Sequence, residues 1–424
     1  MPTRFRWLLP LLLAACSATA APPLPQTDPA DAGMSAPRLE RLHAFMREAT
    51  DDDGYLGGVT LVARGGRLVD WQAYGHRDLA RAQPMQRNDI FRIYSMTKTI
   101  TSVAVLMLME DGRLGLEDPV TRYLPELAVL QVVDGGTADT PVLRAPATPI
   151  TLRMLLTHTA GFAAGLPGDE IAGELRERVD TRAATDLRGV VERLAKAPLA
   201  ADPGTRFGYE GANTDVLARV VEVVSGEPFD RFLQARIFTP LRMTDTGFTV
   251  PRSQRERVVD ITVMGDDGTL VLDDGVSARA PGEALTPYPS GAGGLYSTAA
   301  DYARFAQMLL DGGTLDGASI LGRKTVELML RNHLTMLDPP VTQFSASEGF
   351  GLGGYVVIDA AARGVPGSPG QFGWTGAAST AYWIDPQERL LAILLLQHLP
   401  NGKPDDLPRI SRRFQALVPQ ALLP

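Results

Sequence analysis

The order of the predicted strands and helices constrains the fold of this chain more than any other feature. Strand-like apolar runs bounded by turn residues lie near both ends of the chain: 58–63, 67–74, 355–358, 379–384 and 390–397. The stretch between them is rich in helical patterns separated by Pro/Gly loops. This order predicts an α/β (α+β) fold with two domains. We expect residues 35–95 and 286–424 to form the α/β domain, and residues 96–285 to form a mainly helical domain inserted into it.

The composition of the chain excludes several classes of protein. Its 424 residues, of which 45% are hydrophobic and 21% charged, are typical of a soluble globular protein. The 41 Lys and Arg against 49 Asp and Glu leave a net charge of −8, which argues against nucleic-acid binding. The single Cys excludes an intrachain disulfide, and the 5 His include no pair spaced four residues apart. We therefore expect neither a metal nor another cofactor.

The first 21 residues have the pattern of a secretory signal peptide. Two arginines precede a short apolar run, which is too short to span a bilayer, and small residues follow. Within this segment Leu13-Ala14-Ala15-Cys16 resembles the lipobox of bacterial lipoproteins, in which the cysteine becomes the lipidated first residue. Cleavage after Ala18-Thr19-Ala20 is the alternative, and it would discard Cys16. The pattern predicts a bacterial protein exported to the periplasm or attached to a membrane through Cys16, with residues 22–34 as a linker.

The tetrapeptide Ser95-Met96-Thr97-Lys98 carries the chemistry that we expect. A serine and a lysine three residues apart on a helix lie on the same face, so the ammonium group can reach the hydroxyl and ease its deprotonation. The chain has only 4 lysines, so about 0.14 such pairs are expected by chance. The alternative is that Ser95 only caps a helix.

Four stretches of the chain resemble the signatures of one enzyme superfamily. They are residues 91–98 (FRIYSMTK), 112–120 (GRLGLEDPV), 155–162 (LLTHTAGF) and 291–298 (GAGGLYST). In this order they are similar to the class C β-lactamases, DD-peptidases and family-eight carboxylesterases, a branch of the serine β-lactamases and penicillin-binding proteins. The likeness runs from about residue 35 to about residue 398. It implies a β-lactamase/transpeptidase-like fold, with an antiparallel sheet flanked by helices and an inserted helical domain.

The resemblance also implies roles for particular residues. Ser95 is the nucleophile that forms an acyl-enzyme, and Lys98 together with Tyr209 moves its proton. The family usually has Asn two positions after this tyrosine, where this chain has Gly211. Asn213 is the candidate replacement as a substrate-binding residue, and its role stays open. Packing at the entrance of a helix is the alternative role for Tyr209.

A third element, Trp374-Thr375-Gly376, departs from the Lys-Thr-Gly of the family. In the family, the lysine helps to bind the carboxylate of β-lactams and D-alanyl peptides. Tryptophan offers an apolar face and one NH group instead, so we expect Trp374, Thr375 and Gly376 to bind an uncharged acyl or alcohol group. The resemblance implies that the backbone NH groups of Ser95 and Ala377 form the oxyanion hole. The alternative is that Trp374 is a core aromatic residue.

Together these observations predict an exported serine hydrolase that needs no cofactor and acts on a small-molecule ester or amide, most simply a carboxylic ester. A D-alanyl-D-alanine carboxypeptidase, a D-amino-acid amidase and a β-lactamase are alternatives within the same superfamily. Because position 211 lacks Asn and position 374 lacks Lys, a non-catalytic binding protein of the cell envelope is a further alternative.

Overall fold

The structure, a computed structural model, describes residues 24–51 and 54–424. The expected signal peptide and the lipidation candidate Cys16 lie outside the described residues. Within the described ranges, no helix combines the length and the apolar character that crossing a membrane requires.

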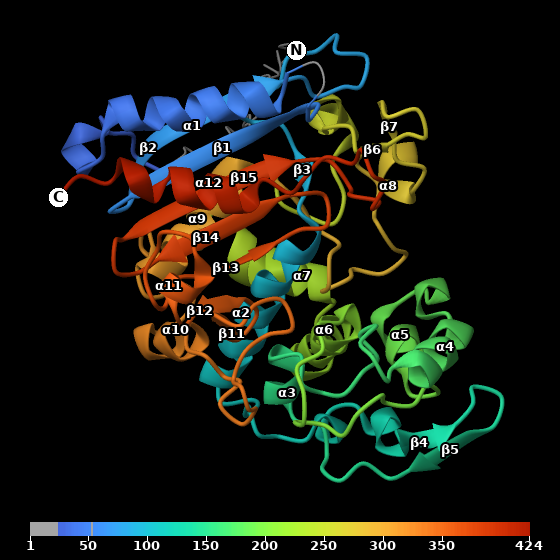
Figure 1. The fold of residues 1–424 in the computed structure, drawn as a ribbon. Helices are drawn as coiled ribbons and strands as arrows, with labels where there is room; N and C mark the ends of the chain where they lie inside the picture. The colour runs from blue at the N-terminus through green and yellow to red at the C-terminus, as the bar shows by residue number, and fades with distance from the viewer. Residues whose placement is uncertain (1–23, 52–53) are drawn as a thin grey trace, which may run out of the picture.

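One seven-stranded antiparallel sheet dominates the structure (Figure 1). In spatial order, its strands are β11 (Glu348–Phe350), β12 (Tyr355–Val357), β13 (Phe372–Thr375), β14 (Ala381–Asp385), β15 (Leu390–Leu396), β1 (Gly57–Arg64) and β2 (Arg67–Gly75). The first five strands come from the carboxyl-terminal part of the chain and the last two from the amino-terminal part, and β15 pairs with β1 from Gly58↔Leu396 to Arg64↔Leu390. The strand-like runs at the two ends of the sequence therefore form a single sheet.

The local sequence explains the hairpin and the central strand of this sheet. Gly65 and Gly66 connect β1 to β2 with φ of 58° and 79°, a left-handed conformation that glycine adopts without steric cost. All seven residues of β15 are buried, so this strand is a continuous apolar run and lacks the alternation of a half-exposed strand. Helices α1 and α12 pack together against one side of the sheet, and α9 packs against β1, β14 and β15 on the other (Figure 1).

The helices have these bounds: α1 Ala36–Ala49, α2 Thr97–Glu110, α3 Leu152–Leu156, α4 Glu170–Val179, α5 Leu187–Leu194, α6 Gly211–Ser225, α7 Phe229–Leu233, α8 Val276–Arg279, α9 Ala299–Leu310, α10 Arg323–Met329, α11 Ala360–Arg363 and α12 Ser411–Leu417. Four further strand pairs lie outside the main sheet: β3 (Phe91–Arg92) with β8 (Tyr296–Ser297), β4 (Val132–Gly136) with β5 (Pro141–Arg144), β6 (Thr262–Met264) with β7 (Leu270–Leu272), and β9 (Thr314–Leu315) with β10 (Ala318–Ser319).

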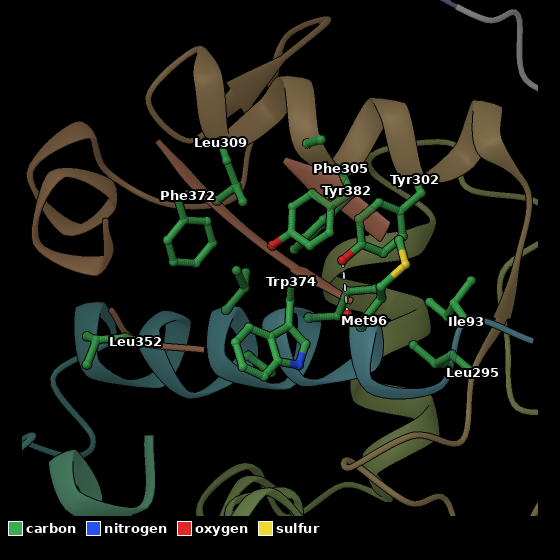
Figure 2. Packing of buried hydrophobic residues seen from close by; sticks show 14 of the residues in the cluster. Ile93, Met96, Leu295, Tyr302, Phe305, Leu309, Leu352, Phe372, Trp374 and Tyr382 are labelled. Atoms are coloured by element: carbon green, nitrogen blue, oxygen red, sulfur yellow. Dashed lines mark hydrogen bonds between the residues drawn. The ribbon is translucent and has the colours of Figure 1, made fainter. Parts of the chain in front are cut away.

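Helix α2 lies between the sheet and the helical part of the molecule, where α6 packs against it (Figure 1). All of its residues from Thr97 to Leu108 are buried, which explains why its sequence is apolar on more than one face. Figure 2 shows the core above this helix, where Met96 and Ile93 meet residues of α9 and of the sheet. The Tyr302 hydroxyl donates to the Met96 carbonyl oxygen at 3.0 Å, and the Tyr382 hydroxyl donates to Thr99 Oγ1 at 2.9 Å. Two buried tyrosines thus fix the amino-terminal end of α2, where Ser95 is found.

Candidate active site

Ser95 lies in a short 3-10 turn, Tyr94–Met96, that leads directly into α2. Tyr94 has φ of 43°, a conformation that costs a residue with a side chain about 1–3 kcal/mol. The buried neighbours Ile93 and Met96 hold this turn, whereas Ser95 itself is only partly buried. The surrounding core therefore holds the serine hydroxyl in a strained turn at the molecular surface.

Lys98 reaches Ser95 as its spacing predicts. Its Nζ atom donates to Ser95 Oγ at 3.1 Å and to the carbonyl oxygen of Ala292 at 2.6 Å. The residue is only 4% exposed, so its ammonium group acts in a medium of lower dielectric than water. The Ala292 contact arises because β3 pairs with β8, which follows Ala292 closely in the sequence. This arrangement stabilises negative charge on Ser95 Oγ.

Tyr209 lies beside Lys98, just before the start of α6. The Lys98 Nζ atom is 5.0 Å from the centroid of the Tyr209 ring. The Tyr209 hydroxyl oxygen accepts a hydrogen bond from Trp374 Nε1 at 2.9 Å, and the Tyr209 backbone NH donates to Gln343 Oε1 at 3.1 Å. The structure therefore brings Ser95, Lys98, Tyr209 and Trp374 together, although Tyr209 and Trp374 are 165 residues apart.

Trp374, in β13, has a different set of contacts from those expected from its sequence. Its indole NH group donates a hydrogen bond to the Tyr209 hydroxyl oxygen and so positions that hydroxyl. Its ring lies against Tyr209 (centroids 4.9 Å apart), Phe350 (5.1 Å) and Phe344 (6.2 Å). Phe344 is 53% exposed, so this group of rings reaches the molecular surface. The apolar character that the sequence predicts at this position is thus supplied by several rings together.

Asn213, the candidate replacement for the family asparagine, is buried and is not among the residues that line the Ser95 cavity. Asn213 is 1% exposed, and its side-chain NH₂ group donates to the Glu210 carbonyl oxygen at 3.1 Å and lies 3.2 Å from His158 Nδ1. Gly211 lines a cavity together with Ser95. A Cβ atom at position 211 would lie 3.2 Å from the Cβ of Ala292, whose carbonyl holds Lys98. Glycine therefore leaves room for the loop that positions the lysine.

His158 contacts the Tyr209 ring and binds the backbone that follows it. The ring centroids of His158 and Tyr209 are 4.7 Å apart, and His158 Nδ1 accepts a hydrogen bond from the Glu210 backbone NH at 3.2 Å. Burial, together with the positive charge of Lys98, lowers the pKa of His158 well below its usual value. The imidazole is therefore neutral and holds the turn that carries Tyr209.

The turn after β13 lies against the chain that precedes Ser95. A Cβ atom at Gly376 would lie 2.6 Å from the Ile93 carbonyl oxygen, so only glycine permits this approach. Arg409 donates to the carbonyl oxygens of Gly376 at 3.3 Å and Ala377 at 3.2 Å. Because C=O and NH point in opposite directions in a trans peptide, the contact with Gly376 also fixes the direction of the Ala377 NH group. No motif in the sequence singles out Arg409, although its contacts hold the backbone of the expected oxyanion hole.

Ser95 opens into a cavity of about 250 Å³. Its polar lining residues are Tyr94, Ser95, Arg176, Thr181, Arg182, Glu210, Asp215, Thr286, Tyr288 and Ser290. Residues 24–51 and 54–424 contain no group of three or more His, Cys, Asp and Glu that could hold a metal ion.

Asp215, on α6, is a further residue of this site that the sequence did not single out. Its Oδ1 atom accepts hydrogen bonds from Ser290 Oγ at 2.8 Å and from the Ala292 NH at 3.1 Å. Burial raises the pKa of Asp215 to about 6, although both hydrogen bonds and the charge of Lys98 act in the opposite direction. Asp215 thus holds the backbone of Ala292, whose carbonyl oxygen holds Lys98, and we interpret it as a positioning residue.

Two substitutions of Asp215 distinguish the effect of its hydrogen bonds on activity from the effect of its charge. We expect Asp215→Ala, which removes both bonds, to lower kcat/KM about 10- to 100-fold, and Asp215→Asn, which can still accept them, to lower it less than about tenfold. The Asn variant is also expected to lose any acidic limb of the pH–rate profile near the Asp215 pKa of about 6.

Stability provides the matched control for this prediction. A carboxyl group with a raised pKa stabilises the fold at low pH and loses that contribution as pH rises through its folded pKa. Asp215→Asn should therefore raise Tm relative to the wild type more at pH 8 than at pH 4. Asp301, whose pKa burial raises to about 7, allows the same substitution away from Ser95. Asp301→Asn should change stability in the same direction without altering the pH–rate profile. An equal change in the pH–rate profiles of Asp215→Asn and Asp301→Asn would contradict the positioning role of Asp215.

Comparison with known proteins shows which family this chain belongs to. The family model described as Beta-lactamase matches residues 42–417. Esterase EstB of Burkholderia gladioli is 31% identical over 403 residues, which cover 88% of this chain and 94% of EstB. Lovastatin esterase of Penicillium rubens is 31% identical over 373 residues, which cover 82% of this chain and 91% of that protein.

A solved structure gives the same result for the fold. The structure of EstCE1, described as a hydrolase with promiscuous acyltransferase activity, is 27% identical with a TM-score of 0.73 and covers 91% of this chain and 98% of EstCE1. The expected β-lactamase/transpeptidase-like fold is thus confirmed, as is the resemblance to the superfamily of serine β-lactamases and penicillin-binding proteins. This chain belongs to the Beta-lactamase family and is a serine hydrolase.

Proposed function

We propose that this protein hydrolyses carboxylic esters through an acyl-enzyme on Ser95. The observation that carries the proposal is Trp374, which takes the place of the lysine in the sequence motif of the family and whose NH group donates to the Tyr209 hydroxyl oxygen. The names of EstB and lovastatin esterase, both 31% identical to this chain, support ester substrates.

Each step of the proposed reaction uses a group in the site. Ser95 Oγ attacks the ester carbonyl carbon, and its proton passes to the pair formed by Tyr209 and Lys98. The backbone NH groups of Ser95 and Ala377 hold the negative charge that forms on the carbonyl oxygen. Collapse of this intermediate breaks the bond to the alcohol, which leaves with the proton. Water then attacks the acyl-enzyme, releases the acid and restores the serine hydroxyl.

The contacts of Tyr209 suit a residue that accepts a proton. Trp374 Nε1 donates to its oxygen at 2.9 Å, and Lys98 Nζ lies 5.0 Å from its ring centroid. Both contacts stabilise negative charge on the phenol oxygen. Donation from Trp374 also fixes the direction in which this oxygen presents its remaining lone pair.

The rings around Trp374 favour an apolar group in the substrate. Phe344, which is 53% exposed, lies 5.8 Å from Tyr209 and 6.2 Å from Trp374 between ring centroids. Covering such a surface with an acyl or alkyl group removes apolar area from water and contributes to binding. A charged group placed on these rings would lose hydration without gaining a partner.

We also propose that the protein is exported and lipidated on Cys16. The arginines, the apolar run and the Leu-Ala-Ala-Cys sequence of residues 1–16 support this proposal. A labelled fatty acid should be incorporated into the wild type but not into Cys16→Ser. If the wild type is not labelled, lipidation is contradicted and simple export with cleavage after residue 20 is favoured.

Three substrate classes test the proposed activity directly. We expect the purified protein to hydrolyse p-nitrophenyl butyrate with a kcat/KM at least about 10³-fold above that for benzylpenicillin or a D-alanyl-D-alanine peptide. An acyl-enzyme that forms on Ser95 with benzylpenicillin but not with the ester would contradict the proposal and favour a β-lactamase or peptidase. Failure of a fluorophosphonate to label Ser95 would favour a non-catalytic binding protein.

A further inference from the structure

Two polar groups in the Ser95 cavity have hydrogen-bonding capacity that the fold leaves unused. Tyr288 lines this cavity and is 6% exposed, yet no partner for its hydroxyl is found among the described residues. Burial and the Asp215 carboxylate raise the pKa of Tyr288, and the charges of Arg182 and Arg176 act on the same hydroxyl in the opposite direction. A tyrosine hydroxyl and a guanidinium group thus face one region of the cavity that holds the nucleophile.

Of the two arginines that line the cavity, one has a partner among the described residues and one does not. Arg176 binds Glu210 through a contact of 2.6 Å between Nη2 and Oε1, and it also donates to the Ala163 carbonyl oxygen at 3.0 Å. Asp215 accepts from Ser290 and Ala292, as described above. Arg182 forms no ion pair or hydrogen bond within the part of the chain that the structure describes, and it is exposed. The cavity therefore presents an unpaired guanidinium group.

The region beyond the cavity does not neutralise this group. Arg182 also lines a neighbouring hollow of about 580 Å³, whose other charged residues are Arg176, Glu177, Asp180 and Glu210. Neither Glu177 nor Asp180 comes within 4.0 Å of the Arg182 guanidinium nitrogens, since no such ion pair is found among the described residues. An incoming anion can therefore approach Arg182 from the Ser95 side with its charge unpaired.

We infer that the cavity beside Ser95 contains a subsite for a carboxylate carried by the substrate, bound by the Arg182 guanidinium and the Tyr288 hydroxyl. This inference rests on the proposed esterase activity and names its substrate class. The substrate is an ester whose acid or alcohol part bears a second, ionised carboxyl group. A planar guanidinium with a neighbouring hydroxyl donor matches the two oxygens of such a group. Together with the aromatic rings of Phe344 and Trp374, the subsite selects an ester that is apolar on one part and anionic on another.

Two pairs of esters test the subsite. The first pair, p-nitrophenyl valerate and mono-p-nitrophenyl glutarate, differs by a carboxylate on the acid; the second, the butyrates of 4-hydroxybenzamide and 4-hydroxybenzoate, differs by a carboxylate on the alcohol. We expect Arg182→Gln to lower kcat/KM about tenfold or more, mainly through KM, for the anionic member of at least one pair, and less than twofold for the neutral members. Tyr288→Phe should lower kcat/KM for the same anionic substrate by a smaller factor.

Arg188→Gln is the matched control. Arg188 lies on α5, whose residues Val190 and Leu194 line the cavity, but its own side chain is 67% exposed and pairs with Glu192. This variant changes the net charge of the protein equally and should leave both members of each pair unchanged. Equal losses for neutral and anionic esters in Arg182→Gln, or no loss for either, would overturn the subsite.

A binding measurement separates the subsite from the esterase activity. In the Ser95→Ala protein, monomethyl glutarate should give saturation-transfer NMR signals that disappear when Arg182→Gln is added, whereas methyl valerate should be insensitive to that change. If the wild type hydrolyses no ester but Arg182-dependent binding is observed, the proposed activity fails and the subsite stands. If esters are hydrolysed but binding and kcat/KM are both independent of Arg182, the subsite fails and the activity stands.

Discussion

Ser95→Ala is expected to reduce the hydrolysis of p-nitrophenyl butyrate to the uncatalysed background, a loss of at least about 10⁴-fold in kcat. The hydroxyl is the atom that attacks the carbonyl, and its only described side-chain partner in the site is Lys98 Nζ at 3.1 Å. Initial rates measured on the purified variant and on the wild type test whether Ser95 is the nucleophile.

The fold should survive this substitution. Ser95 is partly exposed, and the turn around it is held by the Tyr302–Met96 hydrogen bond rather than by its own side chain. We therefore expect a Tm within a few degrees of the wild type. Mass spectrometry of the wild type after ester addition should locate the acyl group on the peptide that contains Ser95. Turnover by a well-folded Ser95→Ala protein, or an acyl group on another residue, would contradict the assignment.

Lys98→Met is expected to lower kcat/KM about 10³- to 10⁴-fold while retaining most of the side-chain volume. The substitution removes the contact with Ser95 Oγ at 3.1 Å and the positive charge near the Tyr209 ring. It also leaves the Ala292 carbonyl oxygen without the partner at 2.6 Å, so we expect a loss of about 1–3 kcal/mol of stability. The loss of activity should persist at temperatures well below the Tm of the variant, and rate and denaturation measurements together establish this.

Lys196→Met provides the matched control for this prediction. Lys196 is exposed, and it lies after α5 in the helical part of the chain. Its substitution removes the same charge from the protein and should leave kcat/KM within twofold of the wild type. Activity of Lys98→Met within tenfold of the wild type, in a protein shown to be folded, would mean that Tyr209 works without the lysine.

Local features of the sequence were sufficient to predict the nucleophile and its partner. The Ser95–Lys98 spacing is a property of one helical turn, so the contact follows from the helix alone. The hairpin at Gly65 and Gly66 and the apolar strand β15 also depend only on residues that are adjacent in the sequence. The start of α6 at Gly211 depends on Glu210, whose side chain caps the helix by accepting a hydrogen bond from the Ala212 NH.

The sequence by itself determined the sheet-forming ends and the Ser-x-x-Lys helix, because these are patterns of adjacent residues. The resemblance to the family added that Trp374 takes the place of a lysine. Only the tertiary structure decided that Trp374 donates to Tyr209, that Asp215 holds the loop behind Lys98, and that Arg182 and Tyr288 share the Ser95 cavity. Each of these arrangements joins segments that are far apart in the chain, and only the folded chain brings them together. No local spacing encodes such an arrangement, so residue type alone could not assign these roles.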